Sequence, residues 1–181
     1  MVAPTLTERA RRVRLVLLDV DGVLTDGKIV VHADGNESKT FDIRDGTGIV
    51  LAQKAGVRVG LLSARQSAAT TERANQLRIT IVRQGALDKL STYESLLAEL
   101  GLDDEDVAFM GDDLLDLPVL GRVGLAAAPA DAVPEVKAVT HWVSRARGGD
   151  GAVRELTEIV LKAQDRWAAL VAEWTPAPTQ P

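Results

Sequence analysis

The 181-residue sequence contains no cysteine, which excludes disulfide bonds, thiolate metal sites and thiol nucleophiles. Aromatic residues make up only 3%, too few for the stacking platforms on which single-stranded nucleic acids bind. No apolar run approaches the roughly twenty residues that span a bilayer. Basic residues are outnumbered 21 to 26, and the net charge of −5 disfavours a nucleic-acid-binding face. We therefore expect a cytoplasmic protein that binds neither nucleic acid nor membrane.

What is present is an ordinary globular composition, 46% hydrophobic and 26% charged. Short apolar runs rich in β-branched residues predict strands at Leu15–Val20, Val57–Leu62, Thr80–Val82, Val107–Met110, Val123–Ala126 and Thr140–Val143. Amphipathic stretches predict helices at Gly48–Ala55, Ser67–Leu77, Lys89–Leu100, Leu114–Leu120 and Ala152–Trp174. Strands that alternate with helices in this way predict an α/β fold with a doubly wound, Rossmann-like parallel sheet.

One segment departs from this alternation. Lys28–Ala33 and Ser38–Ile43 flank the turn sequence Asp34-Gly35-Asn36, so a β-hairpin is predicted where a helix would be expected. No interdomain linker stands out, and residues 1–174 are expected to form one domain. The proline-rich residues 175–181 cannot continue a helix and are expected to be a disordered tail.

Two aspartates end the first predicted strand, and a glycine follows them. Ligands of open α/β sheets bind beyond the carboxyl ends of the strands, which is where Asp19 and Asp21 lie. Alternation along an extended chain puts both carboxylates on one side, where they repel each other unless a cation such as Mg2+ is near. The alternative interpretation is an ordinary aspartate-rich turn.

A second acidic cluster, Gly111-Asp-Asp-Leu-Leu-Asp116, follows the strand predicted at Val107–Met110. A helix is predicted directly after it, so one of these acids could be an N-cap residue, which is the alternative interpretation of Asp113. Since one cap does not need three carboxylates, at least one is available for another role. We choose Asp112 as a metal ligand at the same edge of the sheet as Asp19.

Two more strand ends carry polar or basic residues. Ser63 and Arg65 follow the strand that ends at Leu62, and they suit phosphate binding. Their alternatives are a helix cap for Ser63 and a surface salt bridge for Arg65. Lys89 opens a predicted helix, where a cation opposes the helix dipole and therefore needs an anion nearby. The alternative interpretation is a solvated lysine that pairs with Asp88.

Together these residues could carry out phosphoryl transfer. Asp19 would be the nucleophile that forms an aspartyl phosphate. Asp21 would protonate the leaving alcohol and then deprotonate the attacking water. Mg2+, Lys89 and Ser63 would hold the phosphoryl oxygens and neutralise their charge.

The order of these motifs resembles the haloacid dehalogenase superfamily of phosphohydrolases, and most closely its capless members that dephosphorylate 3-deoxy-D-manno-octulosonate 8-phosphate. The resemblance covers residues 15–159. It rests on Asp19-Val-Asp-Gly-Val-Leu-Thr-Asp-Gly27, Phe41-Asp-Ile-Arg-Asp-Gly46, Gln84-Gly85 with Lys89, Gly111-Asp-Asp-Leu-Leu-Asp-Leu-Pro118 and Gly148-Gly-Asp-Gly-Ala-Val-Arg-Glu155.

This resemblance implies Mg2+ held by Asp19, Asp112 and the main-chain carbonyl of Asp21. It also implies a sugar phosphate bound by Asp21, Asp42, Ile43, Arg44, Asp45, Gly46, Arg65, Arg73 and Lys89. Members of this kind are homotetramers in which the hairpin, here residues 28–43, closes a neighbour's site in place of a cap domain. The lengths of two segments agree with the absence of a cap domain, because residues 22–56 and 64–88 are too few to contain one.

The implied reaction is hydrolysis of 3-deoxy-D-manno-octulosonate 8-phosphate to the free sugar and phosphate. Two residues depart from the family pattern, Ala64 in place of a glycine and Val50 in place of a basic residue. A nine-carbon ulosonate 9-phosphate is therefore an alternative substrate. Two alternatives from other classes are a receiver-like phospho-acceptor domain and a non-catalytic module that binds sugar phosphates or oligomerises.

Overall fold

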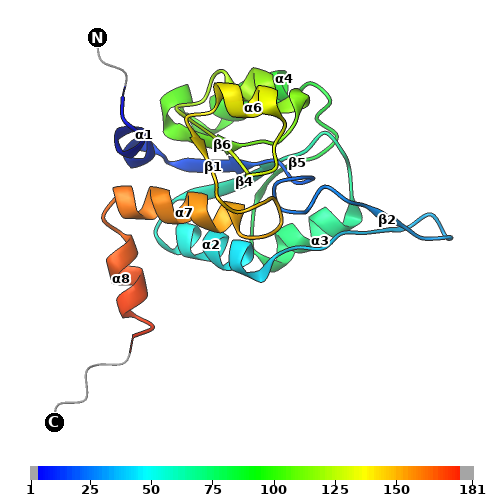
Figure 1. Ribbon diagram of the computed structural model, residues 1–181, viewed down its shortest axis with the longest axis horizontal. Coiled ribbons are helices and arrows are strands. Elements are labelled where there is room, and N and C mark those ends of the chain that lie inside the picture. Colours follow the sequence, from blue (N-terminus) through cyan, green and yellow to red (C-terminus); the bar gives the residue numbers. More distant parts are fainter. Residues whose placement is uncertain (1–3, 176–181) are drawn as a thin grey trace.

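Six parallel strands form the central sheet of the computed structural model, which describes residues 4–175 (Figure 1). They are β1 (Leu15–Leu18), β4 (Arg58–Leu62), β5 (Ile81–Arg83), β6 (Val107–Met110), β7 (Leu125–Ala128) and β8 (Trp142–Val143). Their order in the sheet is β5-β4-β1-β6-β7-β8, and every neighbouring pair is parallel. The predicted doubly wound sheet is confirmed.

Helices cover both faces of this sheet. One face packs against α1 (Leu6–Arg12), α2 (Ile43–Lys54), α3 (Ala68–Gln76), α7 (Ala152–Ala163) and α8 (Trp167–Ala172). The other packs against α4 (Lys89–Leu100), α5 (Leu117–Leu120) and α6 (Pro134–Val139), of which α4 and α6 are seen above the sheet in Figure 1. Short 3-10 helices lie at Asp104–Asp106 and Leu114–Asp116. Every residue of β1, β6 and β7 is buried, as expected for parallel strands covered on both sides.

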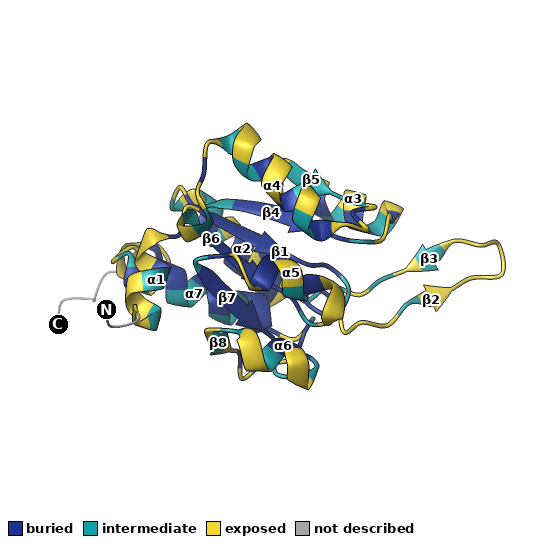
Figure 2. Ribbon diagram, turned by 90° about the horizontal axis from the view of Figure 1, so that it is seen from above, coloured by how far each residue is buried: buried dark blue, intermediate teal, exposed yellow. Residues whose placement is uncertain are grey.

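The predicted hairpin projects from the sheet as an exposed arm (Figure 2). Its strands are β2 (Val30–Val31) and β3 (Glu37–Ser38), paired antiparallel with Val30 opposite Ser38. They are shorter than predicted because, within residues 4–175, no second layer covers the arm, and Val31 is 74% exposed. The predicted strand as far as Ile43 is wrong: the Asp42 carboxylate accepts the N–H groups of Arg44 and Asp45, so α2 begins at Ile43 and not at Gly48.

The helix predicted from Ala152 to Trp174 is two helices. It stops at Gln164, and Asp165 adopts a left-handed conformation with φ of 57°. An L-residue in that conformation cannot continue a right-handed helix, so α8 starts afresh at Trp167. Residues 176–181 of the predicted tail lie outside the described residues.

No cap domain interrupts the described part of the chain. Between β1 and β4 lie only the hairpin and α2, and between β4 and β5 only α3. Within residues 4–175, no helix is both long and apolar enough to cross a bilayer.

Candidate active site

Asp19 and Lys89 form a buried ion pair at the carboxyl edge of the sheet. Asp19 directly follows β1, and Lys89 is the first residue of α4. The Lys89 Nζ donates to Asp19 Oδ1 at 2.7 Å and to Asp116 Oδ1 at 2.6 Å. These two carboxylates are the anions that a lysine at a helix N-terminus needs. Asp88 is not the partner, because its carboxylate caps α4 by accepting the Ser91 N–H.

Asp112 completes the acidic cluster. It follows β6, the strand beside β1, and oxygens of Asp19, Asp112 and Asp116 lie within 4.8 Å of one another. The second oxygen of Asp116 accepts the main-chain N–H of Asp112 at 2.9 Å and of Asp113 at 3.3 Å. Both oxygens of Asp116 therefore have partners, and they hold Lys89 and the loop after β6 in place. Within the described chain, no hydrogen bond reaches the Asp112 carboxylate, which leaves it able to bind a ligand.

Burial and mutual repulsion make these carboxylates hard to ionise. Burial, together with the Asp116 charge, raises the pKa of Asp19 to about 6, although Lys89 opposes both effects. Burial together with Asp19 raises the pKa of Asp112 to about 8. Burial lowers the pKa of Lys89, but the charges of Asp19 and Asp116 outweigh it and the net shift is upward. A bound divalent cation would relieve the repulsion and favour the ionised carboxylates.

The donor set fits such a cation. A Cβ atom on Gly22 would lie 2.0 Å from Asp112 Oδ2, and the φ of Gly22 is +93°, so only glycine leaves room for that carboxylate. No N–H in residues 4–175 donates to the main-chain oxygen of Asp21. Two carboxylates and one carbonyl are oxygen ligands of the kind that Mg2+ prefers.

The side chain of Asp21 belongs to a second cluster. Lys39 Nζ lies 2.7 Å from Asp21 Oδ1 and 2.9 Å from Oδ2. Arg65 Nε lies 3.8 Å from Asp21 Oδ2, and its Nη2 donates to Glu37 Oε2 at 2.9 Å. Sequence analysis missed Lys39 and Glu37, because no motif marks them and only the path of the hairpin brings them to Asp21.

Ser63 follows β4, the other neighbour of β1, and is 2% exposed. Its Oγ accepts the Arg65 N–H at 3.3 Å. The helix-cap alternative for Ser63 is wrong, since α3 begins five residues later and Ser67 occupies its N-cap position. The salt-bridge alternative for Arg65 is present, but its partners are Glu37 and Asp21.

The segment 42–46 lies beside the same loops. Arg44 Nη2 reaches Asp42 Oδ2 at 3.1 Å and Asp150 Oδ1 at 2.6 Å. Asp150 follows two glycines that pack against the loop after β1, where a Cβ on Gly148 would lie 1.8 Å from the Gly22 carbonyl oxygen. Arg44 therefore stands near the acidic clusters, with its side chain 62% exposed.

The other members of this segment differ in accessibility. Ile43 is 81% exposed, whereas Gly46 is buried beneath Arg73, whose Nη2 donates to the Asp42 carbonyl at 3.4 Å. Asp45 accepts the N–H groups of Gly151 at 3.2 Å and Arg154 at 2.8 Å, and so ties α2 to the start of α7. Burial raises the pKa of Asp45 to about 6. In the structure, Asp45 supports the fold through these two hydrogen bonds. That Asp45 contacts the substrate stays a prediction.

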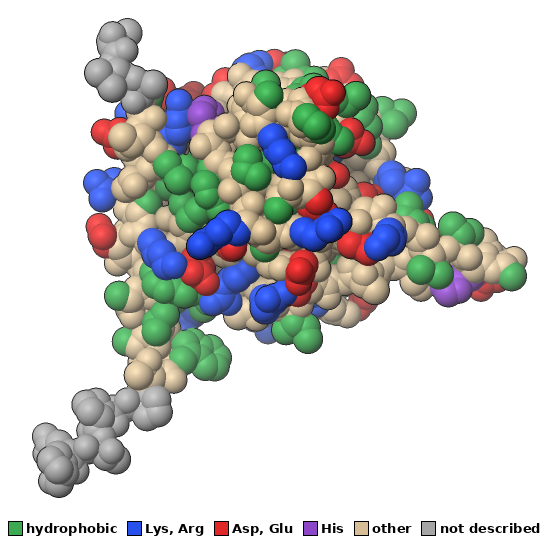
Figure 3. Space-filling model, viewed as in Figure 1, with side chains coloured by type: hydrophobic (Ala, Val, Ile, Leu, Met, Phe, Trp, Pro, Cys, Tyr) green, Lys and Arg blue, Asp and Glu red, His purple; other side chains and the backbone are tan. Residues whose placement is uncertain are grey.

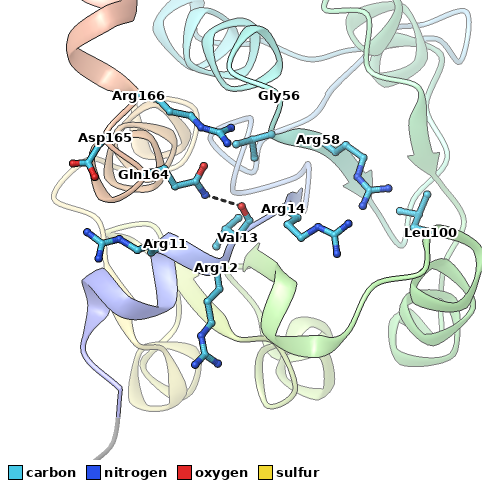
Figure 4. A pocket seen from close by; sticks show the side chains of 11 residues that line it. Arg11, Arg12, Val13, Arg14, Gly56, Arg58, Leu100, Gln164, Asp165 and Arg166 are labelled. Atoms are coloured by element: carbon cyan, nitrogen blue, oxygen red, sulfur yellow. Dashed lines mark hydrogen bonds between the residues drawn. The ribbon is translucent and has the colours of Figure 1, made fainter.

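A basic hollow of about 680 Å³ lies at the opposite edge of the sheet (Figure 4). Its lining includes five arginines, Arg11, Arg12, Arg14, Arg58 and Arg166. Several lining side chains are engaged with main-chain carbonyls: Arg11 binds that of Ala163, and Gln164 binds that of Val13 at 2.7 Å. These contacts join α1 to the end of α7. Among its lining residues Asp165 is the only carboxylate, and it is exposed, whereas Asp19, Asp112 and Asp116 lie close together at the carboxyl edge, so the acidic clusters are the candidate active site.

Comparisons with known proteins agree with this geometry. Residues 60–156 match the model of the haloacid dehalogenase-like hydrolases. The chain is 44% identical to the 3-deoxy-D-manno-octulosonate 8-phosphate phosphatase KdsC of Yersinia pestis over 165 residues, covering 91% of this chain and 88% of the relative.

Solved structures of phosphatases are also similar to this chain. A probable YrbI family phosphatase from Pseudomonas syringae pv. phaseolica superposes with a TM-score of 0.93 at 44% identity, covering 95% of this chain and 98% of that one. The 3-deoxy-D-manno-octulosonate 8-phosphate phosphatase of Moraxella catarrhalis, solved with magnesium, phosphate and a KDO molecule, superposes with a TM-score of 0.92 at 34% identity, covering 94% and 98%. The chain therefore belongs to the haloacid dehalogenase-like hydrolases and, among them, to the 3-deoxy-D-manno-octulosonate 8-phosphate phosphatase family.

Proposed function

We propose that this protein hydrolyses 3-deoxy-D-manno-octulosonate 8-phosphate to the free sugar and inorganic phosphate. The observation that carries the proposal is the buried pair of Asp19 and Lys89, with Asp112 beside it, at the carboxyl edge of the sheet. Curated relatives that share 39 to 44% of their residues with this chain are phosphatases of that sugar phosphate.

The reaction proceeds in two displacements at phosphorus. An oxygen of Asp19 attacks the phosphoryl group, and the bond from phosphorus to the sugar oxygen breaks. Asp21 gives its proton to the departing oxygen. Asp21 then accepts a proton from water, whose oxygen attacks the phosphorus and breaks the bond to Asp19. Phosphate leaves, and both aspartates return to their starting states.

Mg2+ is the proposed cofactor, held by Asp19, Asp112 and the main-chain oxygen of Asp21. When bound, it neutralises charge on the phosphoryl oxygens. Lys89 holds Asp19 Oδ1, and the other Asp19 oxygen is the proposed nucleophile. Lys89 and the hydroxyl of Ser63 bind the phosphoryl oxygens, and Asp116 keeps Lys89 in place.

The sugar contacts the residues around this centre. Arg44, 62% exposed at the rim, and Arg65, beside Asp21, suit the carboxylate and hydroxyl groups of an ulosonate. Asp42, Ile43, Asp45, Gly46 and Arg73 complete the proposed substrate site.

Residues 1–174 act as one catalytic domain in the cytoplasm, with residues 28–43 as a flap. The proposed assembly is a homotetramer in which the flap closes a neighbour's site. In its support, the arm projects from the sheet and exposes Val30 and Val31, and apolar side chains show along it in Figure 3. A site without a cap still needs water excluded during phosphoryl transfer, and a neighbour can supply that closure.

Phosphate release from a panel of substrates tests the proposal. The panel holds 3-deoxy-D-manno-octulosonate 8-phosphate, a nine-carbon ulosonate 9-phosphate and an aryl phosphate, each with Mg2+ or with EDTA. We expect Mg2+-dependent turnover that is fastest on the eight-carbon substrate. Faster turnover of the nine-carbon substrate would indicate that the nine-carbon ulosonate 9-phosphate is the substrate instead. Stoichiometric phosphorylation without release would indicate a receiver-like domain, and no reaction would indicate a binding module.

A further inference from the structure

Lys39 is a buried lysine on an otherwise exposed arm. It lies one residue beyond β3, at the root of the hairpin, and its side chain is 0% exposed. Burying an ammonium group is costly unless carboxylates compensate. Its partners are Asp21, whose two oxygens lie 2.7 and 2.9 Å from Nζ, and Glu37, whose Oε1 lies 3.9 Å away.

Glu37 and Lys39 act as a unit because residues two apart in an extended strand point the same way. Arg65, after β4, anchors this unit by donating to Glu37 Oε2 at 2.9 Å, and it lies 3.8 Å from Asp21 Oδ2. The root of the hairpin is thus fixed to the sheet through Arg65, and Lys39 reaches Asp21 from that fixed position.

We infer that Lys39 is a positioning residue that fixes the Asp21 carboxylate for its two proton transfers. The inference rests on the proposed function, in which Asp21 is the general acid and base. Proton transfer requires the carboxyl group within hydrogen-bonding distance of the leaving oxygen and later of the water. Among residues 4–175, Lys39 and Arg65 supply the only salt bridges to Asp21, and Lys39 is the closer of the two.

The test compares Lys39→Met and Lys39→Arg with the control Lys162→Met. Lys162 also pairs with one carboxylate, that of Glu158 at 2.7 Å, but it lies on α7 and is 54% exposed. Two substrates are used with the Mg2+-loaded protein, 3-deoxy-D-manno-octulosonate 8-phosphate and p-nitrophenyl phosphate. The sugar alcohol needs a proton to leave, whereas p-nitrophenolate leaves without one.

For Lys39→Met on the sugar phosphate, we expect kcat to fall about 10- to 100-fold with KM changed less than about threefold, because only proton transfer is impaired. On p-nitrophenyl phosphate, the same variant should release a first equivalent of nitrophenolate rapidly and then turn over slowly, because only the second displacement needs Asp21. Lys39→Arg should recover most of the activity, and Lys162→Met should match the wild type.

Two outcomes would overturn the inference. A higher KM for the sugar phosphate, with kcat unchanged on both substrates, would make Lys39 a substrate-binding residue. Equal losses on both substrates without the rapid first equivalent would mean that Lys39 only supports the fold. If the wild-type protein hydrolyses neither substrate, the proposed function fails, and this inference fails with it.

Discussion

The residues of the candidate active site differ from most charged residues of the protein because they are buried. Asp19, Lys89 and Asp116 are each less than 10% exposed, although a buried ion pair seldom stabilises a fold more than apolar residues would. The pair and the third carboxylate are better explained by chemistry than by stability. The displaced pKa values of Asp19 and Asp112 fit that explanation, since perturbed groups cluster at functional sites.

The first prediction concerns the nucleophile. Asp19→Asn keeps the shape of the side chain but removes the attacking oxygen anion, so phosphate release should fall at least about 1000-fold. Circular dichroism and thermal unfolding should show an intact fold, because the substitution also removes repulsion from Asp116. The exposed Glu105, substituted to Gln, is the matched control. Activity of Asp19→Asn within tenfold of wild type would exclude Asp19 as the nucleophile.

The second prediction concerns Gly22. In Gly22→Ala the new methyl group meets Asp112 Oδ2 at 2.0 Å, so the variant should lose Mg2+-dependent activity and about 1–3 kcal/mol of unfolding free energy. Gly35→Ala is the control, because Gly35 also has a positive φ of +84° but no heavy atom within 4 Å of its Cβ position. Chemical denaturation and phosphate release measure both effects. Equal losses of activity and of unfolding free energy in the two variants would show that backbone strain alone is responsible, and not the contact with Asp112.

Sequence reasoning found residues at strand ends and missed residues whose role depends on a long-range contact. Asp19, Asp112 and Lys89 were predictable because parallel strands deliver their terminal residues to one edge. Asp116 was visible in the motif, but its bonds to Lys89 and to two main-chain N–H groups required the path of the loop. Lys39 is separated from Asp21 by the bend into the hairpin, which local patterns do not specify.

At the level of elements, the alternation of strands and helices was predictable, while several boundaries were not. The hairpin strands are short because the arm packs on nothing within the described chain, and the last helix breaks at Asp165 because of a single left-handed residue. Apolar periodicity reports what packs on the core, so it cannot locate these features. The arm itself also bears on function, because its root brings Lys39 to Asp21 and Glu37 to Arg65.

The third prediction concerns the rim of the site. Arg44→Gln removes the contacts to Asp42 and Asp150, and its cation is proposed to bind the sugar and not the phosphoryl group. We expect KM for 3-deoxy-D-manno-octulosonate 8-phosphate to rise about tenfold, while kcat/KM for an aryl phosphate stays within about twofold. Steady-state kinetics, with the exposed Arg12→Gln as control, checks this. Parallel losses on both substrates would contradict a role in binding the sugar.

At the scale of the whole molecule, metal binding and pH should be linked. The folded-state pKa values of Asp19 and Asp112, about 6 and about 8, exceed the usual value of 3.8, so without a metal the folded protein holds protons that the unfolded chain has released. Their contribution to stability is therefore present below about pH 4 and is lost as the pH rises toward 8.

The fourth prediction follows from that linkage. Mg2+ competes with those protons, so it should raise the Tm more at pH 8 than at pH 5. Differential scanning fluorimetry with Mg2+ and with EDTA at each pH measures the gain and cancels the effects of other titrating groups. Asp112→Asn should reduce the gain at pH 8. A gain that is larger at pH 5 would contradict the assignment of these carboxylates as ligands.

Trapping of the covalent intermediate tests the central claim most directly. During turnover of 3-deoxy-D-manno-octulosonate 8-phosphate with Mg2+, borohydride should reduce an aspartyl phosphate to homoserine, and peptide mass spectrometry locates the reduced residue. We predict homoserine at position 19, absent without substrate and absent from Asp19→Asn. Homoserine at position 21 or 112, or continued phosphate release with no reduced aspartate under conditions that trap a related phosphatase, would contradict the account.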